Sequence, residues 1–174
     1  MYQGVEIAPA RLEDVPGMQA LIKKFADRND MLHRPFSELY ENLRDYHVAR
    51  LGDRVVGCAA VHCVWEDLAE LKGMAIDEDV QGLGVGKRLA EACLRDAARF
   101  GIRRVFTLTL RPGFFEKLGF RTTAIDGLPQ KVWGECYRCP KYRSHCDEIA
   151  LTLELSPTGE VVKRHRLDLA AAGA

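Results

Sequence analysis

Apolar residues recur along this chain with two different periods, and their alternation predicts an α/β order of elements. Between Val15 and Phe25 they return every three or four positions, which is typical of a helix packed on a core. Shorter apolar runs predict seven strands, at residues 5–9, 47–51, 54–65, 69–76, 105–110, 120–125 and 149–155. Four helices are predicted: one capped by Glu13 or Asp14, one capped by Ser37, and two at 86–100 and 112–118.

The order of elements and the chain length indicate one domain with a mixed sheet of six to seven strands. The chain has 174 residues, of which 47% are hydrophobic, enough to bury one sizeable core. Gly52-Asp53 predicts a tight hairpin between two strands. We expect the domain to span residues 1–155, with an irregular insert at 126–147 and a tail at 156–174.

Charge and hydropathy narrow the classes of partner. The 25 Lys and Arg residues balance the 25 Asp and Glu residues, and the Lys and Arg residues are scattered along the chain. This balance argues against nucleic acid and against an anionic membrane surface as partners. Because the chain also has no apolar run near the ~20 residues of a spanning helix, we expect a cytoplasmic protein. A homodimer is possible, and the sequence does not fix the oligomeric state.

The turn Gln81-Gly82-Leu83-Gly84-Val85-Gly86-Lys87 joins a predicted strand to a predicted helix. Its glycines let the backbone approach an anion, and the helix N-terminus adds partial positive charge, so the turn predicts a pyrophosphate cradle. Arg88 stands where a Walker loop needs Ser or Thr, and the glycine spacing is not that of a dinucleotide fingerprint. A glycine-rich turn without a ligand is the alternative.

The pattern Q-x-x-G-x-G in this turn resembles the acetyl-coenzyme A loop of the GCN5-related N-acetyltransferases (GNAT). The later stretch FFEKLGF, at 114–120, is similar to the helix and turn that close the coenzyme site in that superfamily. The resemblance implies a GNAT fold whose sheet splays between the fourth and fifth strands, here 69–76 and 105–110. It also implies that acetyl-CoA binds to the backbone of Met74, Ala75, Ile76 and residues 81–87.

Longer stretches resemble one family within this superfamily. The runs VVGCAAVHCVWEDLAELKGMAI, RRVFTLT and LPQKVWGECYRCPK are similar to the stand-alone, ArgA-type N-acetylglutamate synthases. This resemblance implies acetyl transfer to the α-amino group of L-glutamate, the first step of arginine biosynthesis. Another amino acid, a small amine or a protein N-terminus is the alternative acceptor. A non-catalytic CoA-binding module and a zinc-knuckle interaction protein are alternatives from other classes.

Acetyl transfer to an amine needs a proton acceptor and donors for the developing oxyanion. Glu70 lies on the strand that leads into the cradle, where many acetyltransferases carry a glutamate base, and it is our candidate. We expect an oxyanion donor among the backbone N–H groups near Met74 or Ala75, and a β-bulge at Gly73. Phe115 stands where many relatives carry a Tyr that protonates the leaving thiolate. Tyr137 or Tyr142 could substitute for it.

Glutamate carries two carboxylates that need cationic partners. Lys72 is two residues from Glu70 and so shares its strand face if no bulge intervenes. Arg138 and Lys141, in the insert, are further candidates to bind the substrate. Relatives often carry an Arg in the first strand, where this chain has Ile7, Ala8 and Pro9.

The six cysteines fall into two groups. We expect Cys58, Cys63 and Cys93 to be small core residues. The insert holds Cys136, Cys139 and Cys146 at the spacing C-x2-C-x6-C, with His145 beside the last cysteine. These residues could bind zinc, stay reduced or form a disulfide. We expect reduced thiols and no required metal, because no second ligand pair follows.

Overall fold

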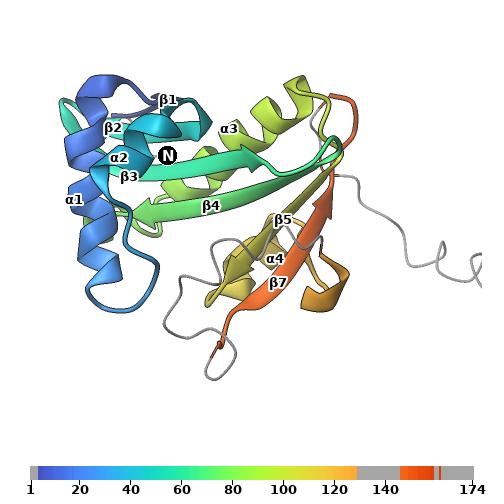
Figure 1. Ribbon diagram of the computed structural model, residues 1–174. Helices are drawn as coiled ribbons and strands as arrows, with labels where there is room; N and C mark the ends of the chain where they lie inside the picture. The colour runs from blue at the N-terminus through green and yellow to red at the C-terminus, as the bar shows by residue number, and fades with distance from the viewer. Residues whose placement is uncertain (1–3, 129–145, 159–160, 162–174) are drawn as a thin grey trace, which may run out of the picture.

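The protein folds around a seven-stranded mixed sheet with helices on both faces (Figure 1). The computed structural model describes residues 4–128, 146–158 and 161. The strands run in the order β1-β2-β3-β4-β5-β7-β6; their bounds are β1 Val5–Pro9, β2 Tyr46–Leu51, β3 Arg54–Cys63, β4 Leu68–Ile76, β5 Arg104–Thr109, β6 Arg121–Thr122 and β7 Ile149–Glu154. The helices are α1 Val15–Ala26, α2 Phe36–Glu41, α3 Val85–Arg99 and α4 Pro112–Lys117. Short 3-10 turns are η1 Leu12–Asp14, η2 Leu43–Asp45, η3 Glu78–Val80 and η4 Ile125–Gly127. The predicted α/β fold class is confirmed.

Buried side chains form three clusters around the sheet. The largest lies under α3 and is continuous from Val5 in β1 through Leu71 in β4 to Leu151 in β7. On the opposite face, a second cluster joins α1 and α2 to β2, β3 and the end of β4. A third, small cluster contains Leu68, Phe106, Leu128 and Ala150. The core is therefore continuous on the α3 face and divided on the α1 face.

The sheet parts between β4 and β5. These two strands are parallel and pair through only three residues of each, from Leu68↔Arg104 to Glu70↔Phe106. Beyond Glu70 they diverge, as Figure 1 shows, although β5 stays paired with β7 along its whole length. The predicted splay between the fourth and fifth strands is confirmed.

A bulge in β4 lies at the start of this gap. Cys58 pairs with Ala75 but Ala60 pairs with Lys72, so β4 carries one more residue than β3 over this stretch. Gly73 has φ +59°, a conformation that favours glycine, and a Cβ there would lie 3.0 Å from Tyr46 Oη. The expected bulge at Gly73 is confirmed.

Two local predictions are wrong. Ser37 is not the N-cap of the second helix, because Pro35 occupies that position and the helix begins at Phe36. Proline has no N–H to satisfy, and its fixed φ suits the residue where the helix starts. Cys63 is exposed rather than buried, because β3 ends there and the chain turns back. Cys58 and Cys93 are buried as expected.

Some element boundaries also differ from the prediction. The strand expected at 54–65 ends at Cys63, because backbone N–H groups of Val64 and Trp65 bond to Leu68 O in a turn. The strand expected at 120–125 is reduced to Arg121–Thr122. None of the helices in the described ranges combines the length and apolar composition that a bilayer crossing requires.

We expect Gly73→Ala to destabilise the protein more than Gly52→Ala. Both glycines have φ +59°, so each substitution incurs the left-handed strain of roughly 1–2 kcal/mol. Nothing lies within 4 Å of an added Cβ at Gly52, whereas Tyr46 lies against one at Gly73, which adds about 1–3 kcal/mol of overpacking. Urea unfolding of both variants measures the difference. Equal losses would mean that Tyr46 gives way and that the bulge tolerates a side chain.

Candidate active site

A large cavity opens where β4 and β5 part. Its volume is about 1030 Å³, which suits a ligand of substantial size. Strand β4 contributes Glu70 through Ile76 except Gly73, and the segment from Thr107 to Arg111 forms the opposing wall. The remaining walls come from the end of α1 and the loop after it, from the glycine-rich turn, from α4 and from the start of β7; they include Phe25, Asp30, Met31, Leu32, Arg34, Gln81, Gly82, Phe114, Phe115 and Ile149.

The glycine-rich turn forms an open concave backbone at one end of this cavity. Gly82 and Gly84 have φ +76° and +81°, and a Cβ added at either would meet nothing within 4 Å. Gly84 is the N-cap of α3 and has no side chain to bond the first N–H groups of that 15-residue helix. Those donors therefore have no side-chain cap at a helix start that borders the cavity, which is the arrangement that binds phosphate groups.

The third glycine of the turn has a different role. A Cβ added at Gly86 would lie 3.3 Å from the Phe114 ring, so this glycine lets α4 pack against the first turn of α3. Gln81 braces the start of the turn, because its Nε2 donates to the Ile76 carbonyl at 2.9 Å. Leu83 is exposed and Val85 is buried in the core; neither side chain is among those that line the cavity. The coenzyme contacts expected for residues 74–76 and 81–87 stay predictions.

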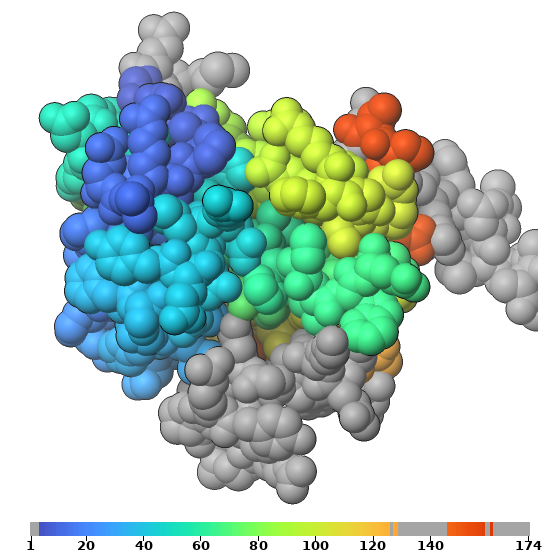
Figure 2. Space-filling model, turned by 45° about the horizontal axis from the view of Figure 1, so that its top comes forward, coloured from blue at the N-terminus to red at the C-terminus, as the bar shows by residue number. Residues whose placement is uncertain are grey.

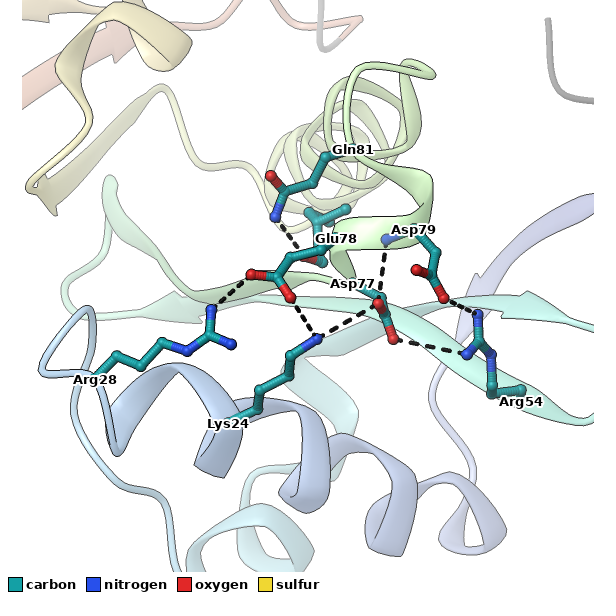
Figure 3. A network of polar contacts seen from close by, with 8 residues as sticks. Lys24, Arg28, Arg54, Asp77, Glu78, Asp79 and Gln81 are labelled. Atoms are coloured by element: carbon teal, nitrogen blue, oxygen red, sulfur yellow. Dashed lines mark hydrogen bonds and ion pairs between the residues drawn. The ribbon is translucent and has the colours of Figure 1, made fainter.

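Ion pairs link residues 77–79, which lead into this turn, to the end of α1 and to β3 (Figure 3). Glu78 accepts from Arg28 Nη1 at 2.6 Å and pairs with Lys24 Nζ at 2.8 Å. These two hydrogen bonds, with Arg28 the stronger, lower the pKa of the Glu78 carboxyl to about 2. On the other side of the turn, Arg54 pairs with Asp79 at 3.3 Å and with Asp77 at 3.9 Å.

Glu70 and Lys72 lie together in the wall formed by β4. Glu70 Oε2 is 3.9 Å from Lys72 Nζ, and each side chain is 14% exposed. The predicted sharing of one strand face is confirmed, since the bulge begins only at Gly73. Both side chains line the cavity, so a carboxylate and an ammonium group are available side by side in this wall.

Arg34 is a candidate functional residue that the sequence reasoning missed. It is only 7% exposed, lines the cavity from the loop between α1 and α2, and pairs with Glu38 one turn into α2. A buried guanidinium at a cavity wall is unusual, because arginine is rarely buried unless it is paired. Nothing in the sequence distinguishes a basic residue that is buried in a loop from one that is exposed to solvent.

Phe115 faces the cavity from α4 and offers no proton. It is 6% exposed and packs edge-on against Phe114 and Phe120, with ring centroids 5.0 and 5.5 Å apart. The place at which relatives carry a tyrosine is thus an aromatic corner of the core. Thr107 and Thr109 are the hydroxyl groups that β5 brings to the opposite wall.

Several predicted residues lie outside the described part of the chain. They are Arg138, Lys141, Tyr137, Tyr142, Cys136 and Cys139, and their proposed roles stay predictions. Among the described residues, no three His, Cys, Asp or Glu side chains are grouped as metal ligands would be. Cys146 lies in the described part of the chain, where it is exposed and lines the cavity.

The fold, the parted strands and the anion cradle together define an acyl-coenzyme A-dependent transferase. The sequence profile of the Acetyltransferase (GNAT) domain matches residues 42–122. An uncharacterised N-acetyltransferase of Chlorobaculum tepidum is 35% identical over 146 residues, which are 84% of this chain and 94% of that protein. The chain therefore belongs to the GNAT family: it is an N-acetyltransferase that uses acetyl-CoA.

The similarity extends to enzymes with a named amino-acid activity. The amino-acid acetyltransferase of Mycobacterium tuberculosis is 36% identical over 123 residues, 69% of each chain. The N-acetylglutamate synthase of Neisseria gonorrhoeae, solved with coenzyme A and N-acetyl-glutamate, superimposes with a TM-score of 0.78 at 25% identity. That match covers 94% of this chain but only 36% of the longer synthase.

We expect Gly84→Asp to abolish binding of acetyl-CoA. The side chain would add bulk and negative charge to the opening of the cradle and force an aspartate to φ +81°. Gly101→Asp is the matched control, because Gly101 has φ +87°, has free space around it and lies at the far end of α3. Titration calorimetry with acetyl-CoA distinguishes the two variants. Wild-type affinity in Gly84→Asp would show that the pyrophosphate binds elsewhere.

We expect Glu78→Gln to raise the KM for acetyl-CoA about two- to fivefold while kcat stays unchanged, because a neutral amide binds Lys24 and Arg28 more weakly than the carboxylate does and so holds the turn less firmly. With its pKa near 2, Glu78 is ionised above about pH 4.5, so the difference persists there and disappears as the carboxyl protonates toward pH 2. High salt should raise the wild-type KM and leave that of the variant nearly constant. Asp79→Asn, which removes only the contact with Arg54, is the control, and an equal effect from it would discount the link to α1.

Proposed function

We propose that this enzyme transfers the acetyl group of acetyl-CoA to the α-amino group of L-glutamate. The observation that carries the proposal is the placement of two buried or half-buried cations, Arg34 and Lys72, in the same cavity as Glu70. A dicarboxylate acceptor needs cations at both ends, and its amine needs a nearby proton acceptor. The likeness to an N-acetylglutamate synthase solved with N-acetyl-glutamate supports the same acceptor. The product would then enter arginine biosynthesis.

The reaction begins with loss of a proton from the bound ammonium group. Glu70 accepts this proton, directly or through a water molecule, so that the amine lone pair is free. The amine then attacks the thioester carbonyl of acetyl-CoA, which lies in the gap between β4 and β5. Holding both reactants in one cavity converts a bimolecular encounter into an intramolecular step.

Collapse of the tetrahedral intermediate expels the coenzyme thiolate, and the nitrogen loses its second proton, to water or to the departing thiolate, as the amide forms. A backbone N–H near Met74 or Ala75, just past the bulge, donates to the developing oxyanion. Phe115 cannot protonate the leaving group, but a thiol with an ordinary pKa of ~8.5 leaves readily as the thiolate near neutral pH. We therefore assign no general acid among the described residues.

Arg34 and Lys72 divide the recognition of the acceptor between them. Lys72 lies beside Glu70, close to the reacting amine, and is suited to the α-carboxylate. Arg34 is rooted in the loop after α1 and is suited to bidentate contact with the side-chain carboxylate. Arg138 and Lys141 stay candidates for further contacts. Asp30, which also lines the cavity, disfavours longer or additional acidic groups at this rim.

We expect glutamate to be acetylated in preference to glutamine and aspartate. The test is a single-turnover screen of the twenty amino acids and small amines with acetyl-CoA. Arg34→Gln should raise the KM for glutamate about ten- to a hundredfold, which corresponds to the loss of roughly 1.5 to 3 kcal/mol of charge-assisted hydrogen bonding. The KM for acetyl-CoA should stay nearly constant.

Glu38→Gln is the matched control for this variant, because it removes the ion-pair partner of Arg34 and keeps the guanidinium. We expect its KM for glutamate to stay within about threefold of wild type, since a neutral partner can still accept a hydrogen bond. Equal turnover of glutamine or of a neutral amine would rule out a carboxylate clamp. The acceptor would then be another amino acid, a small amine or a protein N-terminus.

A further inference from the structure

A histidine on the neighbouring strand lies directly opposite the candidate base. His62 in β3 pairs with Glu70 in β4, so the two side chains leave the same face of the sheet. Directly opposed residues on antiparallel strands have Cβ atoms about 4.5–5.5 Å apart, within reach of each other or of one bridging water. Glu70 lines the cavity, whereas His62 is not among the lining residues.

The same histidine is held in one tautomer by an aspartate. His62 Nδ1 lies 2.6 Å from Asp45 Oδ2, at the end of η2. An ionised carboxylate can only accept, so Nδ1 carries the hydrogen and donates it to Asp45. The other ring nitrogen, Nε2, therefore holds the lone pair and is the atom that can take up a proton.

Exposure increases from the base toward the histidine. Glu70 is 14% exposed, Asp45 28% and His62 40%. In Figure 2 the cyan segment that includes η2 and the green segment at the end of β3 adjoin on the outer surface. The charged groups that face His62 are Asp45 from η2 and Glu70 from β4, with Lys72 beside Glu70. The arrangement therefore runs from the cavity wall to bulk water.

A path from the cavity wall to water would serve the reaction by carrying away the proton that the ammonium group loses. An ordinary glutamate carboxylate is a weak acceptor for an ammonium proton. An ordinary imidazole binds a proton about a hundredfold more tightly, by roughly two pKa units. Moving the proton on from the carboxylate keeps the bound amine neutral for longer, while coenzyme and acceptor fill the cavity and block the direct way out.

We propose that His62 is a positioning residue that relays the amine proton from Glu70 to solvent, with Asp45 fixing its tautomer. In this step an N–H bond of the ammonium breaks and an O–H bond forms on Glu70. The proton then passes to His62 Nε2, and a water or buffer base removes it from the imidazolium ring. The proposal rests on the proposed role of Glu70.

His62→Asn tests the relay, because the amide can still donate to Asp45 but cannot accept a proton. With the preferred acceptor, we expect kcat at pH 7 to fall at least tenfold, with little change in the melting temperature or the KM for acetyl-CoA. The pH–rate profile of the variant should differ in shape from that of the wild type. Added imidazole should restore the rate saturably, which a structural role would not produce. His33→Asn is the matched control, because His33 also pairs with an aspartate, Asp27, but is not among the residues that line the cavity and should retain the wild-type kcat.

The proposed relay through His62 and the proposed role of Glu70 as the base can be disproved independently. Loss of activity in Glu70→Gln together with a wild-type rate and pH profile in His62→Asn would overturn the relay and leave Glu70 as the base. A slow His62→Asn enzyme that imidazole does not restore would also overturn it. Full activity in Glu70→Gln would overturn both. In the double variant we expect no further loss beyond Glu70→Gln and no restoration by imidazole.

Discussion

The parting of β4 and β5 is the constraint on which the rest of the structure depends. Two parallel strands that remained paired would satisfy each other's backbone groups and leave no room between them. Here the ladder ends after Glu70↔Phe106, and the bulge at Gly73 turns β4 away from its neighbour. The gap exposes backbone donors inside the sheet, so a ligand placed there meets hydrogen-bonding groups that a continuous sheet would have used. The cavity and its polar lining follow from that single interruption.

The acidic residues before the glycine-rich turn are neutralised by cations from α1, from the loop after it and from β3. Three consecutive carboxylates, Asp77, Glu78 and Asp79, precede a turn whose backbone is arranged for an anion. Left alone, they would repel a pyrophosphate. Each is paired with Lys24, Arg28 or Arg54, so their field is largely cancelled near the turn. The pairs with Lys24 and Arg28 also fix the position of the turn relative to the end of α1, and the loop that follows α1 forms one wall of the cavity.

Local patterns predicted the features that local chemistry determines. The order of strands and helices, the cradle, the bulge at Gly73 and the neighbouring Glu70 and Lys72 all depend on periodicity, glycine placement or two-residue spacing. Arg34 could not be found in this way, because its burial results from the approach of an α1–α2 loop to a strand far along the chain. Ser37 and Cys63 were misassigned for a related reason. Pro35 pre-empted the cap, and the end of β3 depends on where the turn to β4 closes.

The unequal division of the core makes the enzyme mechanically asymmetric. On the α3 face the buried side chains run without interruption from β1 to β7, whereas on the α1 face they fall into two separate clusters, one under α1 and α2 and one where β4 still pairs with β5. The packing on the α3 face therefore holds the two halves of the sheet together, whereas the packing on the α1 face does not join them. Widening the gap between β4 and β5 would separate few packed side chains on the α1 face, but it would break the continuous core on the α3 face. The cavity wall formed by the loop after α1 can therefore shift without breaking the continuous core, whereas the wall next to α3 cannot.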